Sequence, residues 1–266
     1  MKTFRLIGAA LLAVLMCANF ASCSTDDDAA NTDVGGNDEG GNQEVTVSEK
    51  KLVKMVSNEE TYTFSYDDEG RLSSAIETDD DGDYGYKYSY KIVWGDDAVV
   101  VKYEYETASG YNNGKTYTET YTLKDGLVQD WMSDNHSGIY SYNSSNRLIK
   151  AEFTHHLGYT VNAVWDKDKL VSVKPDDSYG AILTYGETCK KGYFPLISDI
   201  IELGDVLFMA HPEIAGMRTN QLPNTYSYED DEDFSLTYEY DKEGYISKIK
   251  MKNEDGESET YTLTWK

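Results

Sequence analysis

The stretch Tyr62-Thr-Phe-Ser-Tyr-Asp-Asp-Glu-Gly-Arg-Leu72 is the clearest guide to the fold, because its pattern is that of a strand, a turn and the start of a returning strand. Aromatic residues alternate with Thr and Ser up to Tyr66, as in a strand with one apolar face. Asp67 suits a turn because its side chain bonds nearby backbone, and Gly70 tolerates a positive φ. The stretch therefore predicts an antiparallel β-hairpin.

The same unit recurs along the chain. Residues 140–148 and 236–246 repeat it, and in all three copies an aromatic residue precedes an aliphatic residue by six positions. Shorter versions occur at residues 94–99, 123–127 and 165–170. Self-similarity of this kind predicts a chain built from successive hairpins.

Residues between the turns alternate in polarity. One face of the segment 84–94 carries Tyr84, Tyr86, Tyr88, Tyr90, Ile92 and Trp94, and the opposite face carries Lys87, Ser89 and Lys91. The composition, with 23 Tyr against 4 Pro, also favours strands over helices. We therefore predict an all-β fold, an antiparallel up-and-down meander that forms a strongly curved sheet or an incomplete barrel.

A membrane-spanning barrel is the alternative, since its strands also alternate. Its lipid-facing belt is aliphatic, whereas the apolar face here is mostly Tyr, so a water-soluble sheet is preferred. One segment, near residues 195–217, departs from the strand pattern: its apolar residues are spaced by three and four, and Pro195 stands near its start. It predicts a helical insertion, which either fills the open side of the sheet or serves as a lid or docking element.

The first 22 residues have the order of an export signal. Lys2 and Arg5 precede an uncharged apolar run that ends at Met16, and small residues stand at 21 and 22. Phe20-Ala-Ser-Cys23 resembles a lipobox, which makes Cys23 the predicted lipid acceptor. Cys17 is the rival acceptor, and an ordinary signal peptide with an incidental cysteine is the alternative reading.

Residues 23–44 form an acidic, glycine-containing stretch with few apolar residues, which predicts a disordered tether. Residues 45–266 then form a single β-rich domain. Ser24-Thr-Asp-Asp-Asp28 resembles the acidic tag that directs Bacteroidetes-type lipoproteins to the outer face of the outer membrane. With the lipobox, the Tyr-Asp-x-x-Gly-Arg-Leu hairpins, the late helical insertion and Asn220-Gln-Leu-Pro-Asn224, the chain resembles Bacteroidetes-type lipoproteins of unknown function with a porin-like fold. The resemblance implies a partly barrel-like sheet and supplies no catalytic residues.

Candidate chemistry is sparse. Asp79, Asp81 and Asp83 are weak candidates for a divalent cation, because an EF-hand alignment places Tyr88 where the bidentate Glu belongs. A solvated turn is the simpler interpretation. His155 and His156 are adjacent, so on a strand they point to opposite faces and cannot share an ion. No nucleophile elbow occurs, and we expect neither catalysis nor a cofactor.

The remaining residues narrow the function without naming it. A net charge of −24 excludes the positive surface that nucleic-acid binding requires. Cys189 is read as a structural thiol, with activation by Lys190 and Lys191 as the alternative. We predict a lipid-anchored envelope protein, facing the cell exterior, that acts as a non-catalytic interaction or structural module with a protein or envelope partner. The alternative is a glycan-binding protein with exposed Tyr and Trp rings, and a hydrolase is third.

Overall fold

A computed structural model describes residues 49–79, 85–110, 113–134, 136–154, 158–176, 180–201, 203–228 and 233–266. The predicted signal peptide, Cys17, Cys23 and the tether lie outside these residues, as do Asp81, Asp83, Tyr84, His155 and His156.

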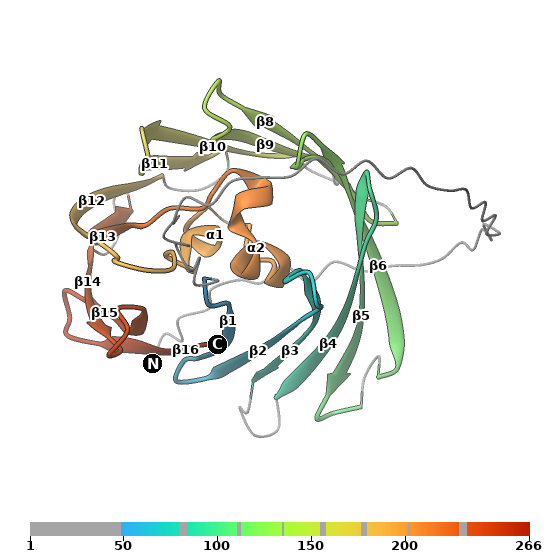
Figure 1. Ribbon diagram of the computed structural model, residues 1–266, viewed down its shortest axis with the longest axis horizontal. Coiled ribbons are helices and arrows are strands. Elements are labelled where there is room, and N and C mark those ends of the chain that lie inside the picture. Colours follow the sequence, from blue (N-terminus) through green and yellow to red (C-terminus); the bar gives the residue numbers. More distant parts are fainter. Residues whose placement is uncertain are drawn as a thin grey trace, which may run out of the picture.

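Within the described ranges, sixteen strands form one antiparallel sheet in which each strand pairs with its neighbours in the chain. The sheet closes because β1 pairs with β16, with Leu52 opposite Trp265 (Figure 1). The strands are β1 Leu52–Val56, β2 Glu60–Tyr66, β3 Leu72–Asp79, β4 Tyr86–Trp94, β5 Ala98–Thr107, β6 Lys115–Lys124, β7 Leu127–Met132, β8 Ser137–Tyr142, β9 Leu148–Thr154, β10 Tyr159–Asp166, β11 Lys169–Pro175, β12 Ala181–Thr188, β13 Gln221–Tyr228, β14 Asp233–Tyr240, β15 Ile246–Asn253 and β16 Ser258–Trp265. The predicted all-β meander is confirmed, and its curvature is complete: the sheet is a closed barrel.

The repeated turns have the predicted local chemistry. Asp67 Oδ1 accepts hydrogen bonds from the backbone N–H groups of Glu69 and Arg71, at 3.0 and 2.9 Å. Asn143 and Asp241 do the same in their own turns. The residue with positive φ is Gly70 in the first copy, Asn146 in the second and Gly244 in the third. Each turn thus satisfies its own backbone donors and fixes the register of the two strands that it joins.

A tryptophan completes each of the three long repeats. Its indole N–H donates to the backbone carbonyl of the aliphatic residue that follows the turn, on the neighbouring strand. The pairs are Trp94 with Leu72 at 2.8 Å, Trp165 with Leu148 at 2.7 Å and Trp265 with Ile246 at 2.7 Å. The repeat is therefore a three-dimensional unit in which a turn, two strands and an indole clamp belong together.

The two surfaces of the barrel wall differ in chemistry. Inward positions carry the aromatic and aliphatic residues of the core. Outward positions on the same strands are mostly Thr, Ser, Lys and Glu, and they include cross-strand ion pairs such as Lys87 with Glu106 at 3.4 Å and Lys248 with Glu239 at 3.1 Å. Eight exposed aliphatic or Met side chains lie on the outer surface, one on each of the strands β3, β4 and β7 to β12. No described helix is long and apolar enough to cross a membrane.

The predicted helical insertion lies inside the barrel (Figure 1). It consists of three short turns, α1 Ile197–Ile200, α2 Val206–Ala210 and the 3-10 turn η2 Pro212–Ala215. Leu207 and Phe208 are at most 2% exposed. Asp205 caps α2, because its Oδ1 accepts from the Leu207 N–H at 2.7 Å. The insertion therefore supplies a core to a barrel that is too wide for its own side chains to fill.

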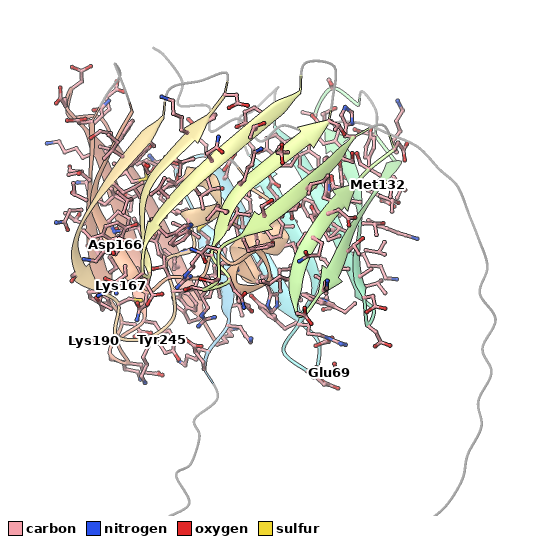
Figure 2. All side chains as sticks on the ribbon, turned by 90° about the horizontal axis from the view of Figure 1, so that it is seen from above. Glu69, Met132, Asp166, Lys167, Lys190 and Tyr245 are labelled. Carbon is pink, nitrogen blue, oxygen red and sulfur yellow. The ribbon has the colours of Figure 1, made fainter. Side chains whose placement is uncertain are left out.

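Strand order gives the barrel two different ends. The insertion between β12 and β13, the start of β1 and the end of β16 share one end with the three long-repeat turns, and we call this end the base. Glu69, Lys167, Lys190 and Tyr245 mark the base in Figure 2. The opposite end, which includes the β1–β2 and β15–β16 turns, is called the rim.

Candidate functional site

Six carboxylates interrupt the aromatic inner wall. Four stand on strands and two on the insertion, and all six are half-buried. We call them the inner carboxylates: Glu60, Glu77, Glu119, Asp199, Asp205 and Glu259. Among the described residues, none of them forms an ion pair with Lys, Arg or His. The barrel interior therefore holds a group of carboxyl groups that have no basic partner among the described residues.

Tyrosine hydroxyls bind the first pair of inner carboxylates. Tyr86 Oη lies 2.9 Å from Glu60 Oε1 and 3.1 Å from Glu77 Oε1, so one hydroxyl bridges the two groups. Tyr90 donates to the other oxygen of Glu77 at 2.7 Å, and Tyr62 donates to Glu60 at 2.8 Å. A hydroxyl has only one proton, so Tyr86 donates to one carboxylate and can accept from the other when that group is protonated.

The electrostatics favour that shared proton. Burial and the nearby charge of Glu60 outweigh the tyrosine hydrogen bonds, and the pKa of Glu77 rises to about 7. The second pair is built the same way: Tyr121 donates to Glu119 at 2.8 Å and also contacts Asp205. Burial, with the charge of Asp205 as a further cause, raises the pKa of Glu119 to about 7.

Asp199 differs from the other inner carboxylates because nothing binds it. It lines a small, mostly apolar cavity of about 20 Å³ with Phe194, Leu236 and Tyr261, a volume for about one water molecule. Its carboxylate has no hydrogen-bond partner among the described residues. Burial, and then the charges of Glu60 and other inner carboxylates, raise its pKa to about 8. Asp199 is therefore largely protonated at neutral pH.

The aromatic stripe predicted on β4 lies beside this cluster. Tyr88 stacks on Tyr105 of β5 with ring centroids 4.6 Å apart, and Tyr103 stacks on Tyr117 at 5.2 Å. The β4 rings face the barrel interior, and those of Tyr86, Tyr88 and Tyr90 stay half-buried, so the insertion does not fully cover them. Stacked rings next to carboxylates can bind sugar hydroxyls and ring faces, or a cation.

The weak metal prediction gains no support. Asp79 is half-buried at the end of β3, and its two predicted companions lie outside the described residues. Within the described ranges, no three His, Cys, Asp or Glu side chains are placed to hold a metal ion. Four of the inner carboxylates, Glu60, Glu77, Glu119 and Asp205, bind tyrosine hydroxyls instead.

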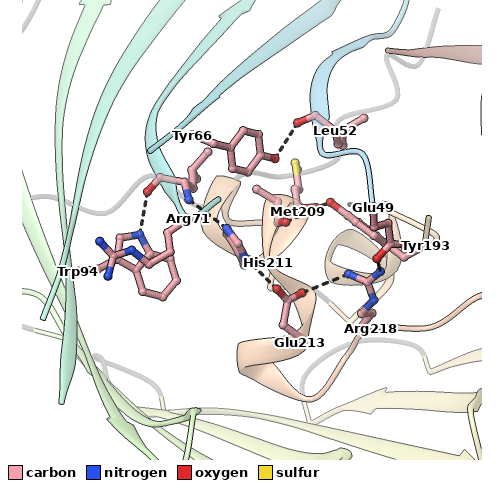
Figure 3. A network of polar contacts seen from close by, with 12 residues as sticks. Glu49, Leu52, Tyr66, Arg71, Trp94, Tyr193, Met209, His211, Glu213 and Arg218 are labelled. Carbon is pink, nitrogen blue, oxygen red and sulfur yellow. Dashed lines mark hydrogen bonds and ion pairs between the residues drawn. The ribbon is translucent and has the colours of Figure 1, made fainter. Parts of the chain in front are cut away.

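Two residues of reactive types, His211 and Cys189, have structural roles. His211 Nε2 accepts from the Leu72 backbone N–H at 3.0 Å, so Nδ1 carries the proton and donates to Glu213 at 2.8 Å (Figure 3). With both nitrogens engaged, the imidazole joins the insertion to the wall. Cys189 is buried, its Sγ lies 3.6 Å from the Gly192 carbonyl, and burial raises its pKa to about 11. The structural-thiol interpretation therefore holds.

Sequence reasoning missed the inner carboxylates, although a signal for them exists. Glu60 stands two positions before Tyr62, and Glu119 stands between Tyr117 and Tyr121, so these acids occupy the aromatic register of their strands. A charged residue in an apolar register marks a buried polar site. Asp199 and Asp205 carry no such signal, because the packing of the insertion places them.

The comparisons identify the fold. No protein-family model matches the chain, and no curated protein matches it. A porin-like protein from Bacteroides uniformis has a similar crystal structure, with a TM-score of 0.62 and 16% sequence identity over 81% of this chain and 98% of that chain. At this identity the likeness is one of fold: a porin-like β-barrel.

Proposed function

We propose that this protein is a lipid-anchored protein of the outer membrane whose barrel stands in water and acts as a non-catalytic binding module. One observation carries the proposal: the outer wall is polar and ion-paired, whereas the inner wall is aromatic and acidic. A membrane-spanning barrel has the reverse arrangement, with an apolar band toward lipid. Membrane attachment then depends on the lipid at Cys23.

The start of β1 supports this arrangement. β1 begins at the base, so we expect a tether from Cys23 to join the barrel at that end. A flexible coil of about 20 residues reaches roughly 25 Å, which leaves the barrel clear of the lipid surface. The rim then faces away from the membrane, toward the medium.

Replacing Cys23 by Ala is expected to abolish fatty-acid labelling of the protein and to release it from the membrane into the soluble fraction. The reason is that the acyl chains attached to Cys23 hold the protein to the membrane in the proposed arrangement. Cys17→Ala is the matched control and should remain labelled and membrane-bound. Retention of the unlabelled Cys23→Ala protein in the membrane would favour a wall that spans the bilayer.

A glycan-binding module is the second candidate. The half-buried rings around Tyr88 and the neighbouring carboxylates favour it, because sugars bind proteins through ring stacking and hydroxyl hydrogen bonds. Both Glu60 and Glu77 are held by the Tyr86 hydroxyl between them, an arrangement that suits binding better than proton transfer to a glycosidic bond.

On a glycan array, the mature chain is expected to retain at least one polysaccharide, and Tyr88→Ala should weaken that retention at least tenfold. An aromatic ring that stacks on a nucleic-acid base contributes about 1–3 kcal/mol. A similar contribution of about 2 kcal/mol to sugar stacking would correspond to more than tenfold in affinity. Ile139→Ala, which changes an outward residue that is 57% exposed, serves as the control. Uniform non-retention, or equal loss in both variants, removes the glycan candidate and leaves the protein-partner interpretation.

A further inference from the structure

A second pocket opens at the base, on the opposite side of the insertion from the rim. Its volume is about 370 Å³. Its charged lining residues are four basic side chains, Arg147, Lys190, Lys191 and Arg218, and two acidic ones, Glu49 and Asp168. Together they give the pocket a formal charge of +2, whereas the whole chain has a net charge of −24. We call it the base pocket. The pocket is therefore a positively charged region of a negatively charged protein.

Glu49, one of the two acidic side chains that line the base pocket, binds two of its donors. Glu49 Oε2 lies 2.6 Å from Arg218 Nη2, and its Oε1 accepts from the Gly192 backbone N–H at 3.2 Å (Figure 3 shows Glu49 and Arg218). A guanidinium and a backbone N–H together form a common anion site. The Glu49 carboxylate therefore shows that these hydrogen-bond donors can bind an anion.

The two arginines are fixed in place. The Arg147 guanidinium lies 5.0 Å from the centre of the Trp165 ring, binds Asp168 and donates to the Arg218 carbonyl. The Arg218 guanidinium lies 4.9 Å from the centre of the Tyr193 ring. Cations held by aromatic rings and carbonyls give a site whose geometry is set before a ligand arrives.

The two lysines have no acidic partner in the described part of the chain. Lys190 and Lys191 are exposed, and among the described residues neither forms an ion pair. The Lys191 ammonium lies 5.6 Å from the centre of the Tyr245 ring, a contact that leaves its N–H donors open to an anion. An ammonium group is a compact charge that suits a phosphate oxygen. Two exposed ammonium groups next to an arginine and a backbone donor match a ligand with two negative charges and three terminal oxygens.

We propose that the base pocket binds a phosphate group carrying two negative charges, and that Glu49 competes for the same donors. Such a group could belong to a free solute or to a lipid headgroup, since the base is the end at which the N-terminal segment joins the barrel. The proposal depends on the pocket alone and not on the function assigned to the barrel interior.

Calorimetric titration of the mature chain from Ser24 with inorganic phosphate, at constant ionic strength, tests the site. The double variant Lys190→Gln/Lys191→Gln should bind at least tenfold more weakly. Glu49→Gln should bind several-fold more tightly, because the internal competitor loses its charge. The control is Lys167→Gln/Lys242→Gln, which removes two exposed charges at the base outside the pocket and should bind as the parent does.

The same four proteins are then floated with vesicles of phosphatidic acid and, separately, of phosphatidylcholine. If the parent protein floats with phosphatidic acid vesicles but not with phosphatidylcholine vesicles, and the Lys190→Gln/Lys191→Gln variant floats with neither, the phosphate belongs to a lipid headgroup. Phosphate binding without flotation assigns it to a solute. The proposal is overturned if neither phosphate nor vesicles bind, or if both double variants lose affinity equally, since the effect is then general charge attraction.

Discussion

At pH 8.5 the Asp199→Asn variant is expected to melt about 6–12 °C above the parent protein, whereas at pH 5 the two should melt within a few degrees of each other. The expected gain is about 3 kcal/mol, since each pKa unit corresponds to about 1.4 kcal/mol and neighbouring carboxylates share the effect. In a domain of this size, 1 kcal/mol shifts Tm by about 2–4 °C.

The sign follows from proton binding. Asp199 has a pKa of about 8 in the folded barrel, against an ordinary value of 3.8. The folded protein therefore keeps a proton that the unfolded chain releases, and stability falls as the pH rises from about 4 through about 8. Asn carries no ionisable group, so the stability of the variant does not fall with rising pH for this reason. Glu77 and Glu119, with pKa values raised to about 7, leave a smaller slope of the same sign.

Thermal melts at half-unit steps between pH 5 and pH 8.5 measure this difference. Asp96→Asn is the matched control, because Asp96 is exposed in the β4–β5 turn. Its curve should run parallel to that of the parent protein. Parallel curves for Asp199→Asn as well would mean that Asp199 is solvated and that the inner carboxylates are not the buried cluster described above.

Replacing Gly216 by Ala is expected to lower the free energy of unfolding by at least about 3 kcal/mol. Gly216 has a φ of +63° at the end of η2, where a side chain alone costs roughly 1–2 kcal/mol. A Cβ there would also lie 2.2 Å from the Asn146 carbonyl oxygen and 3.0 Å from the Leu148 backbone nitrogen. Backbone atoms cannot move aside cheaply, so the insertion or the β8–β9 turn must shift.

Gly126→Ala separates the two causes. Gly126 has a φ of +79°, and an added Cβ would meet nothing within 4 Å. Denaturant unfolding should therefore show a loss of about 1–2 kcal/mol for this control and a clearly larger loss for Gly216→Ala. Equal losses would show that the insertion does not press on the β8–β9 turn.

Local features of this fold could be predicted from the sequence because local interactions determine them. Asp67 and Gly70 set a turn through bonds within a few residues, and the same holds in the other two copies. Barrel closure could not be predicted, because the pairing of Leu52 with Trp265 depends on the summed curvature of all the strands. Alternation shows which residues share a face, but it does not show which edges meet.

Residues of the candidate site could likewise be predicted where the local sequence pattern places them, and not where the tertiary structure does. The alternation of polarity predicted the aromatic stripe on β4. The same alternation could have predicted Glu60 on β2 and Glu119 on β6, because each occupies a position of the aromatic face. Asp199 could not be predicted, because its burial depends on how three short turns fold back inside the barrel. The base pocket joins Glu49, Arg147 and Arg218, which are far apart in the chain and meet only through the closed barrel.

Vesicle flotation of the mature chain produced without its lipid, combined with conductance recording across a planar bilayer, tests whether the barrel wall faces water. We expect the protein to stay soluble without detergent, to remain at the bottom of a gradient with phosphatidylcholine vesicles and to open no channel. Spontaneous insertion with ion conductance would show instead that the wall meets lipid, although ion pairs such as Lys87 with Glu106 lie on its outer surface.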